Sequence, residues 1–261
     1  MNLSSVRLPE SVDSSLMPLP VLLIHGHTLD KRMWQPQIAA LEGQFEIIAP
    51  TLRGYDNSGQ SNSAFSHAED LIALLEARGV ARVHVVGLSL GGNIALEIAV
   101  RFFDRVATLT LLDSSLKGFA PDAAQLEIGH AVQRAFDTGG LEAARVAWLG
   151  APLFAAARED PVLQKQLEAW VADYSGWHWA HGVSPSAQIP DLSSRLSEIT
   201  APTLIAVGER DTAYFHSVAA ALHAGIAGSR LKVIAGAGHM VNLERAEIIN
   251  ALLLEHFGRM A

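Results

Sequence analysis

Cysteine is absent from this chain of 261 residues. Its absence excludes disulfide bonds, thiolate ligands for a metal ion and a cysteine nucleophile. A chain of this size buries roughly three quarters of its unfolded surface, so it needs no such staple to hold its core together. The apolar fraction of 49% is enough to build that core. Because cysteine-free chains suit a reducing compartment, we predict a cytoplasmic location.

Positive charge is also scarce. The 19 Lys and Arg residues stand against 27 Asp and Glu residues, and the net charge is -8. The basic residues form no runs. Nucleic acids and anionic membrane surfaces are bound through clustered cations, so we expect neither as a partner.

Long hydrophobic runs are missing as well. No stretch approaches the roughly 20 apolar residues that a membrane-spanning helix needs. The N-terminal segment Met1–Pro20 carries Glu10 and Asp13 ahead of an apolar stretch that prolines interrupt, where a secretory signal would have a basic flank and an unbroken apolar segment. We therefore expect neither a membrane span nor a secretory signal.

Short apolar runs alternate with longer amphipathic stretches, a pattern that predicts a mostly parallel sheet with helices on both faces. The runs are almost purely apolar, which is typical of strands buried on both sides. They are Val21–Ile24, Phe45–Ala49, Val83–Val86, Ala107–Leu112, Thr203–Val207 and Leu231–Ile234. We also expect a helix over Ala68–Arg78, capped by Ser66 and ended by Gly79, and a closing helix over Glu244–Phe257.

The strand pattern stops between Ser114 and Glu198. Glycines and prolines, among them Gly139 and Gly140, interrupt this stretch, so it is expected to form several short helices. Such an excursion is best explained as a helical cap inserted over the carboxyl edge of the sheet, where open α/β folds bind ligands. We predict a core formed by residues 1–114 and 199–261 and a cap formed by residues 115–198.

The segment Val83–Gly92 runs from an apolar strand through a Gly-x-Ser-x-Gly pattern toward a helix expected to begin near Asn93. A serine on a sharp turn between strand and helix has strained backbone angles, so Gly87 and Gly91 are needed on either side to avoid collisions. The helix N-terminus would also stabilise an anion formed at Ser89. We predict Ser89 as a nucleophile. The alternative is a glycine-rich turn that only packs helix on strand.

A serine nucleophile needs a base, and histidine has the suitable pKa. Among the 11 histidines, His239 lies on a loop before the closing helix, at the same sheet edge as Ser89. The imidazole in turn needs a buried carboxylate to fix its tautomer. Asp211 follows the strand Thr203–Val207 at this edge and completes the chain order Ser, Asp, His. Asp113, at the end of the preceding strand, is an alternative acid.

Acyl transfer also requires two N–H donors that face the developing oxyanion. The backbone N–H of Leu90, directly after the nucleophile, is one candidate. The other is the N–H of His27, which follows the apolar strand Val21–Ile24 and the glycine turn at Gly26. For His25 we predict a structural role, in which it holds this loop by hydrogen bonds.

The predicted cap is rich in tryptophan. We predict that Trp148, Trp177 and Trp179 wall an acyl or alcohol pocket. The alternative is that they pack the cap helices onto one another. A substrate with a free carboxylate would also need a cation in this region, and the candidates are Arg134, Arg145, Arg158 and Lys165.

Together these pieces resemble the α/β-hydrolase superfamily, over residues 20–114 and 201–261. The layout is similar to a small capped branch that contains carboxylesterases, 3-oxoadipate enol-lactonases, meta-cleavage C–C hydrolases and cofactor-free haloperoxidases. Thr28–Gln37 and Arg53–Ser58 resemble that branch too, although Thr51 and Asp56 depart from its usual D-x-R-G-x-G-x-S pattern. A serine nucleophile argues against the dehalogenases and epoxide hydrolases, which use aspartate.

The resemblance implies a serine hydrolase that works through an acyl-enzyme, without a metal ion or an organic cofactor. Our first hypothesis is a carboxylesterase or lactonase for small to medium, apolar small-molecule substrates. A second is an enol-lactone or C–C bond hydrolase of aromatic catabolism. A third, of another class, is a ligand receptor on the same fold with slow turnover. Fold alone cannot decide among them, because one scaffold hosts many chemistries.

Overall fold

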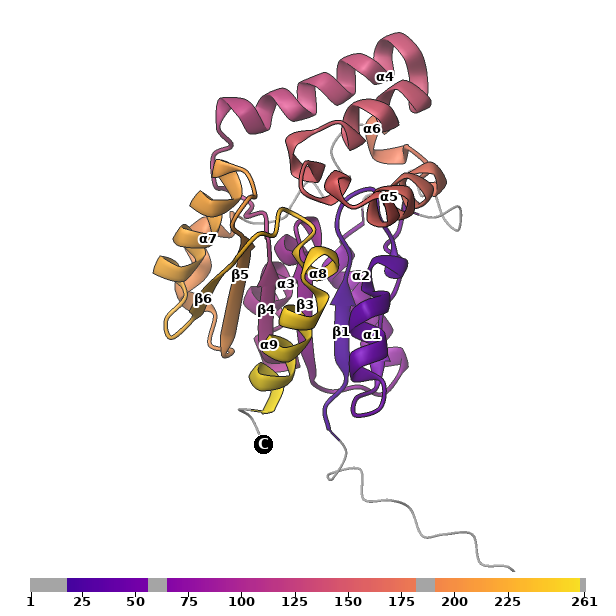
Figure 1. Ribbon diagram of the computed structural model, residues 1–261. Coiled ribbons are helices and arrows are strands. Elements are labelled where there is room, and N and C mark those ends of the chain that lie inside the picture. Colours follow the sequence, from indigo (N-terminus) through magenta and orange to yellow (C-terminus); the bar gives the residue numbers. More distant parts are fainter. Residues whose placement is uncertain (1–17, 56–64, 182–190, 259–261) are drawn as a thin grey trace, which may run out of the picture.

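The computed structural model describes residues 18–55, 65–181 and 191–258. Within these ranges a six-stranded sheet has the order β2-β1-β3-β4-β5-β6, and each neighbouring pair is parallel (Figure 1). The strands are β1 (Val21–Ile24), β2 (Ile47–Ile48), β3 (Val83–Leu88), β4 (Val106–Leu112), β5 (Thr203–Gly208) and β6 (Arg230–Ile234). The predicted parallel sheet is confirmed.

The strand register brings the carboxyl ends of the central strands together. Ile24 at the end of β1 pairs with Gly87 on β3, and Leu88 pairs with Leu112 at the end of β4. On the other side of the sheet Gly208 pairs with Ile234. The loops that follow these strands therefore meet at one edge, although they are far apart in the sequence.

The two outer strands differ from the prediction. At one edge, β2 contains only Ile47 and Ile48 of the expected run Phe45–Ala49. At the other edge, the prediction that β6 is buried on both faces was wrong, since Lys232 and Val233 are exposed. Among the described residues, each of these strands has a neighbouring strand on one side only, so it is less completely covered than the central strands.

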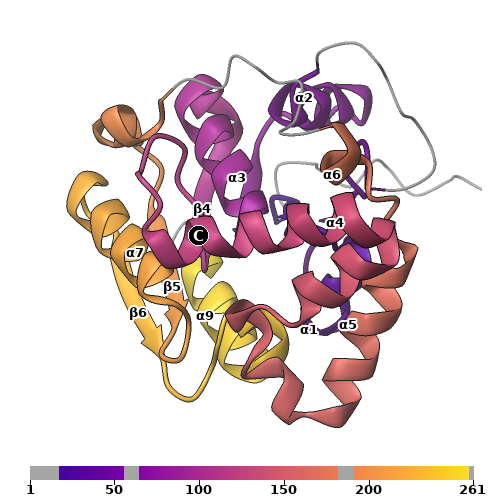
Figure 2. The same cartoon turned by 90° about the horizontal axis from the view of Figure 1, so that it is seen from above.

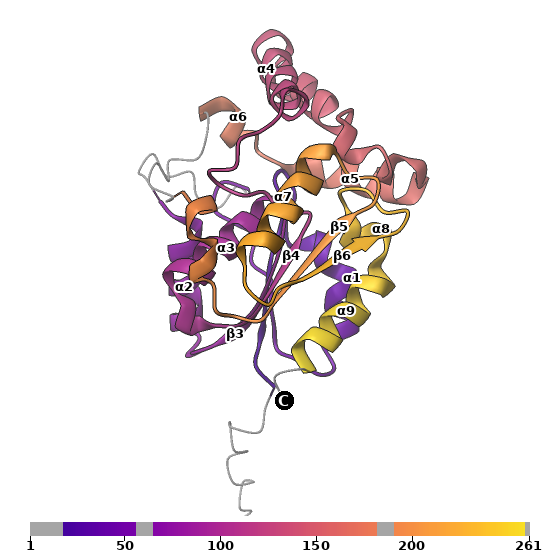
Figure 3. The same cartoon turned by 90° about the vertical axis from the view of Figure 1, so that its left-hand side faces the viewer.

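Helices cover both faces of the sheet (Figure 3). One face carries α1 (Gln35–Leu41) and α9 (Ala246–Gly258), and the other carries α2 (His67–Ala77), α3 (Leu90–Arg101) and α7 (Ala213–Gly225). The predicted ends of α2 are confirmed, because Ser66 accepts a hydrogen bond from Glu69 N–H and Gly79 has a φ of 68°. The predicted closing helix is confirmed as α9, which begins two residues later than expected because Arg245, with a φ of -137°, is not helical and ends the short helix α8 (Val241–Glu244).

A buried amide pair ties α1 to the chain that leads into α9. Gln37 donates through Nε2 to the backbone oxygen of Asn242 at 2.9 Å, and Asn242 donates through Nδ2 to Met33 O at 2.9 Å. Both amide side chains are fully buried. Because Asn242 lies three residues beyond His239, this pair fixes the chain just after the histidine.

Helices α4 (Ala123–Leu149), α5 (Pro161–Asp173) and α6 (Trp177–His181) lie over the carboxyl edge of the sheet (Figures 1 and 2). Short 3-10 helices cover Lys31–Trp34, Phe103–Arg105, Pro152–Phe154, Ala157–Glu159 and Ser193–Glu198. Helix α4 spans 27 residues, but Gly140, with a φ of 72° and a ψ of -162°, is not helical and divides it at a kink into two helices. The predicted interruption at Gly140 is confirmed, whereas Gly139 does not interrupt the helix. In the described ranges, no helix has the length and apolarity to cross a membrane.

Candidate active site

Ser89 occupies a sharp turn between β3 and α3. Its φ of 54° and ψ of -113° are strained for a residue with a side chain. The backbone is held on both sides, since Ser89 N–H donates to Leu112 O at 3.0 Å and Ser89 O accepts from Ser115 N–H at 3.1 Å. Helix α3 begins at Leu90, three residues earlier than expected, so its N-terminus lies directly behind the serine.

The two glycines of the Gly-x-Ser-x-Gly pattern allow very close backbone contacts. A Cβ atom on Gly87 would lie 2.2 Å from Gly91 O, and a Cβ atom on Gly91 would lie 2.0 Å from Ile24 O. Neither distance is possible for a real side chain. The turn therefore requires both glycines, and the reason is the one predicted from the sequence: a side chain at either position would collide with the backbone.

His239 and Asp211 come together from two different loops. His239 follows β6 and Asp211 follows β5, and the His239 Nδ1 lies 2.8 Å from Asp211 Oδ2. Both side chains are buried. Because a carboxylate only accepts hydrogen bonds, Nδ1 carries the proton and Nε2 is left as the acceptor. The Phe215 ring packs 4.2 Å from the imidazole, between ring centroids, and holds its orientation.

Glu244 holds the His239 loop by hydrogen bonds, a role that was not predicted from the sequence. Its carboxylate accepts Gly238 N–H at 2.5 Å and Met240 N–H at 3.1 Å, the two amides that flank the histidine. Partial burial raises the pKa of Glu244 above its usual range. In the sequence, Glu244 only marked the start of the expected closing helix. A glutamate in such a place is indistinguishable from an ordinary residue of a first helical turn.

Asp113, the alternative acid, lies beside Asp211. Asp113 Oδ1 accepts Gly208 N–H at 2.8 Å. Burial raises the pKa of the Asp113 carboxyl well above its usual range, and the neighbouring charge of Asp211 raises it further. Both effects favour the neutral form of Asp113. The His239 ring donates its hydrogen bond to Asp211 and not to Asp113, and this favours Asp211 as the orienting acid.

The same three side chains have the spacing of a metal site. Ligand atoms of Asp113, Asp211 and His239 all lie within 4.8 Å of one another, and they form the one such group in the described ranges. Two of these groups are joined directly, since the His239 ring donates to Asp211, while Asp113 accepts Gly208 N–H.

The neutral state of Asp113 predicts how stability changes with pH. Above about pH 4 an unfolded aspartate loses its proton, whereas folded Asp113 keeps it. The unfolded state then binds fewer protons, so this group lowers the free energy of unfolding as pH rises from about 4 toward its raised folded pKa. An asparagine at this position cannot ionise and can still accept Gly208 N–H. We expect the stability of Asp113→Asn relative to wild type to be greater at pH 8 than at pH 5 in urea unfolding. An equal difference at both pH values would show that Asp113 is already ionised.

The loop after β1 lies against the serine. A Cβ atom on Gly26 would be 3.8 Å from Ser89 Cβ, so the backbone of this loop passes directly beside the nucleophile. The next residue is His27, whose N–H is one predicted oxyanion donor. The other, Leu90 N–H, belongs to the first turn of α3, where N–H groups have no partner inside the helix. Both predicted donors thus lie on backbone next to Ser89.

His25 has the structural role expected for it. It is fully buried, and its Nε2 accepts Leu52 N–H at 2.9 Å. Because Nε2 is an acceptor, Nδ1 carries the proton and donates to Gly26 O at 2.8 Å. His25 therefore joins the loop after β1 to the chain that follows β2.

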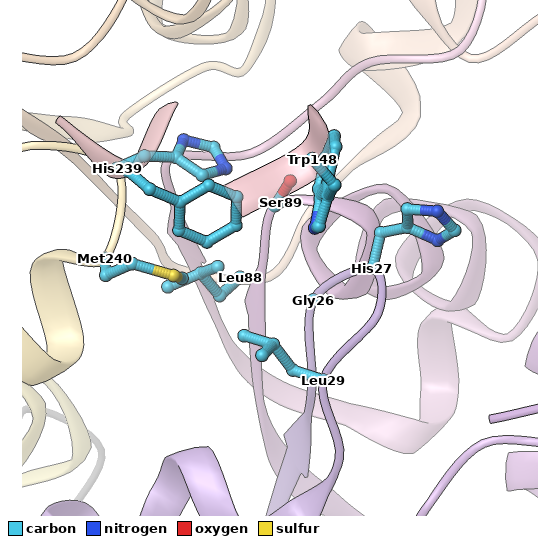
Figure 4. A pocket seen from close by; sticks show the side chains of 9 residues that line it. Gly26, His27, Leu29, Leu88, Ser89, Trp148, His239 and Met240 are labelled. Carbon is cyan, nitrogen blue, oxygen red and sulfur yellow. The ribbon is translucent and has the colours of Figure 1, made fainter. Parts of the chain in front are cut away.

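A small pocket contains both Ser89 and His239 (Figure 4). Its empty space is about 230 Å³, and Ser89 lies between His239 and Trp148 in this view. Within the described residues no hydrogen bond joins the Ser89 hydroxyl to the imidazole, and such bonds commonly tighten only when substrate is bound. The pocket is lined by Gly26, His27, Leu29, Leu88, Ser89, Trp148, Phe154, His239 and Met240.

The structure separates the three tryptophans proposed as pocket walls. Trp148 from α4 lines the pocket. Trp179 packs edge-on against Tyr174, with ring centroids 5.0 Å apart, and Trp177 stacks on His181 at 5.0 Å. Neither is among the residues that line this pocket. The contact of Trp179 with Tyr174, at the end of α5, matches the alternative of packing between helices, whereas Trp177 and His181 belong to the same helix.

A comparison with protein-family models gives one match that spans most of the chain. Residues 21–252 match the model described as the alpha/beta hydrolase family. The chain belongs to this family. The match includes every residue of the site described above.

Individual relatives of this alpha/beta hydrolase carry several names. It is 27% identical to 3-oxoadipate enol-lactonase 1 of Acinetobacter baylyi, over 84% of this chain and 80% of the relative. It is 29% identical to a putative carbamate hydrolase, RutD, of Variovorax paradoxus, over 92% of each. Among solved structures, a thermophilic esterase from Thermogutta terrifontis superposes with a TM-score of 0.80 at 27% identity, over 94% of this chain and 91% of that one.

Three of the four positive side chains considered for binding a substrate carboxylate, all but Lys165, have other partners. Arg134 pairs with Glu127, and Arg158 donates to Leu149 O at 2.6 Å. Arg145 donates to Tyr174 O at 2.6 Å. No Lys or Arg is among the residues that line the pocket of this alpha/beta hydrolase in the described ranges.

Backbone strain in this alpha/beta hydrolase is concentrated at the site. In the described ranges the non-glycine residues with positive φ are Thr28 at 63°, Ser89 at 54° and Asp113 at 40°. They follow β1, β3 and β4 respectively, and all three lie at the carboxyl edge of the sheet. Strained backbone of this kind persists only where surrounding contacts hold it, and it gathers at functional sites.

Proposed function

We propose that this protein is a serine hydrolase that cleaves carboxylic esters or lactones, with Ser89 as nucleophile, His239 as general base and Asp211 as the acid that orients it. The observation that carries the proposal is the pocket in which the strained Ser89 meets an imidazole already hydrogen-bonded to a buried carboxylate. A serine, a base and an orienting acid in this relation are what nucleophilic catalysis requires.

In the first half-reaction, Ser89 Oγ attacks the carbonyl carbon while His239 Nε2 takes the hydroxyl proton. The negative charge that develops on the carbonyl oxygen is stabilised by the N–H groups of His27 and Leu90. Collapse of the tetrahedral intermediate breaks the bond to the alcohol oxygen, and His239 gives its proton to that leaving group. Asp211 stabilises the imidazolium throughout and keeps Nδ1 protonated.

In the second half-reaction, water replaces the alcohol. His239 takes a proton from the water molecule, whose oxygen attacks the acyl carbon attached to Ser89. The bond to Ser89 Oγ then breaks, the serine recovers its proton from His239, and the carboxylic acid leaves. With a lactone, the leaving alcohol and the acid remain parts of one molecule.

The pocket favours small, uncharged acyl groups. Its side-chain walls are mainly apolar, from Leu29, Leu88, Phe154 and Met240, together with Trp148. The space between these walls is small. The relatives named as an enol-lactonase, a carbamate hydrolase and an esterase are all named for cleavage at an acyl carbon. The absence of a lining cation makes a substrate with a free carboxylate the weaker alternative.

We also propose that residues 115–198 form a cap on this site, over a core made of residues 1–114 and 199–261. Two described elements of this segment reach the pocket, since Trp148 belongs to α4 and Phe154 to the 3-10 helix that follows it. Changes in this segment are therefore expected to alter which acyl groups are accepted, while the reacting groups stay on the sheet.

The pocket predicts a preference for short acyl chains. In p-nitrophenyl esters from acetate to octanoate, we expect kcat/KM to fall at least about tenfold between butyrate and octanoate. An open apolar groove would instead gain about 0.8 kcal/mol for each buried methylene. Phe154→Ala removes one wall and should move the optimum to longer chains. The matched control is Phe103→Ala, at an exposed phenylalanine far from the pocket. Equal rates for butyrate and octanoate in the wild type would contradict the small pocket.

The same assay separates hydrolase from receptor. A hydrolase gives steady turnover, whereas a ligand receptor with a residual site gives one burst of p-nitrophenol per protein molecule and then negligible release. Steady turnover would support the proposed function, and a single burst would favour the receptor.

A further inference from the structure

Thr28 joins the loop after β1 to helix α4 by a chain of hydrogen bonds. The indole Nε1–H of Trp148 donates to Thr28 Oγ1 at 2.6 Å. The same hydroxyl donates to the backbone oxygen of His27 at 2.6 Å. Thr28 is almost fully buried, so water does not compete for these bonds. A side chain from α4, 120 residues beyond Thr28 in the sequence, thereby acts on the backbone of His27.

The backbone of Thr28 explains why this chain of bonds matters. Thr28 has a φ of 63°, a conformation that a β-branched side chain strongly disfavours and that glycine adopts freely. Nothing in the turn alone favours threonine over glycine. What threonine adds is the hydroxyl, which bonds the carbonyl before it and accepts the Trp148 indole N–H. The hydroxyl offsets the strain of a conformation that the loop requires.

The peptide group on the other side of His27 is held as well. The carbonyl of Gly26 accepts hydrogen bonds from His25 Nδ1 at 2.8 Å and from Leu29 N–H at 3.4 Å. Because the peptide group is planar and trans, the N–H of His27 points away from that carbonyl. With the carbonyl of Gly26 fixed before it and its own carbonyl fixed after it, His27 has little freedom to redirect its N–H.

The ring of His27 is enclosed by the same helices. Its Nδ1 lies 2.9 Å from the Tyr55 hydroxyl, and its centroid lies 5.4 Å from that of Trp148 and 5.7 Å from that of Tyr174. Burial, together with the nearby His178 and His25, lowers the pKa of His27 to about 3, so the ring is neutral over the working range of pH. Trp148 therefore holds His27 by ring packing and, through Thr28, by a hydrogen bond.

We propose that Trp148 is a positioning residue, which acts through the Thr28 hydroxyl to hold the His27 N–H toward the oxyanion formed at Ser89. The helices over the pocket then help to assemble the catalytic site as well as covering it. This inference rests on the proposed function, because it assigns a role to the His27 N–H that only an acyl-transfer enzyme needs.

A double-mutant cycle tests the inference. Trp148→Phe keeps an aromatic ring and removes the N–H, and Thr28→Val keeps the shape and removes the hydroxyl. We expect each variant to lower kcat for p-nitrophenyl butyrate about 10- to 100-fold with KM changed less than about threefold, since a displaced oxyanion donor weakens only the transition state. The double variant should lose no more than the worse single variant. Thr28→Ser keeps the hydroxyl and should retain most of the wild-type kcat.

Two control variants remove an indole N–H group and a threonine hydroxyl at positions outside the loop after β1. Trp170→Phe changes a buried tryptophan of α5, and Thr110→Val changes a buried threonine of β4 whose hydroxyl has no partner among the described residues. Both are expected to keep kcat within about twofold of wild type. A Trp148→Phe effect confined to KM would show that Trp148 is only a pocket wall. Additive losses in the cycle would show that Trp148 and Thr28 act separately, and either result overturns the inference.

A second measurement does not depend on activity. Hydrogen exchange at the amides of residues 25–29 is expected to accelerate at least about tenfold in Trp148→Phe and in Thr28→Val, while Thr28→Ser and the controls stay near wild type. Unchanged exchange in Trp148→Phe overturns the inference. If the wild type hydrolyses no ester, the proposed function fails. In that case, hydrogen exchange at the amides of residues 25–29 still shows whether Trp148 holds the loop after β1.

Discussion

Replacing Ser89 with alanine is expected to lower kcat for ester hydrolysis by about 10⁶-fold and to leave the fold intact. The loss is this large because the nucleophile, base and acid act as a unit, and removal of the serine alone abolishes the covalent route. Stability should change little, since alanine also has a Cβ atom and meets the same strain at the φ of 54°. The measurement is the turnover of p-nitrophenyl butyrate, with circular dichroism and thermal unfolding to verify the fold.

Covalent labelling identifies the attacking atom independently of the rate. A fluorophosphonate probe should form one bond from phosphorus to Ser89 Oγ with loss of fluoride, and mass spectrometry should place the added mass on the peptide that contains Ser89. Ser217→Ala, which removes an exposed serine hydroxyl on α7, is the matched control and should be labelled normally. Labelling of Ser89→Ala at wild-type speed would disprove the assignment of the nucleophile.

Replacing Asp211 with asparagine is expected to lower kcat by about 10⁴-fold, whereas Asp113→Asn should lower it by about tenfold at most. The His239 Nδ1 donates to Asp211 in the structure. An asparagine there can present its own N–H₂ group instead of an acceptor, which favours the wrong imidazole tautomer and removes the charge that stabilises the imidazolium. At Asp113 the same change replaces a neutral acid with a neutral amide.

The comparison of these two variants is decisive because the two carboxyl groups are neighbours. Both variants remove one carboxyl from the same buried network, so a general loss of packing would affect them similarly. The kcat values should be measured at several pH values, with urea unfolding to compare their stabilities. A large loss in Asp113→Asn together with an active Asp211→Asn would mean that Asp113 is the orienting acid.

The sequence was most informative where local chemistry leaves no choice. Gly87 and Gly91 could be interpreted without a structure because a side chain at either position would collide with backbone, and no distant residue changes that. The apolar runs predicted the central strands for a similar reason, since a strand covered on both faces must be apolar throughout. The edge strand β6 escaped this reasoning, because its neighbours and not its own residues decide how much of it is covered.

The contacts that shape the site could not be predicted in the same way. Thr28 and Trp148 are 120 residues apart, and neither residue has a local pattern that marks it. The sequence predicted Trp148 and Trp177 equally as pocket walls. In the structure Trp148 lines the pocket and Trp177 stacks on His181. Composition alone indicated an aromatic segment. Which ring faces the nucleophile depends on how α4 crosses the sheet, and that follows only from the packed structure.

The three strained residues Thr28, Ser89 and Asp113 set a limit on how this protein can be made more heat-resistant. Glycine at Ser89 would relieve a positive φ without altering the path of the backbone, whereas at Thr28 and Asp113 it would also remove buried hydrogen bonds. A directed-evolution campaign that rewards survival at high temperature alone would therefore favour glycine at Ser89, which removes the proposed nucleophile. Selection would have to be applied to turnover and thermal survival in the same round, because the easiest gains in one are losses in the other.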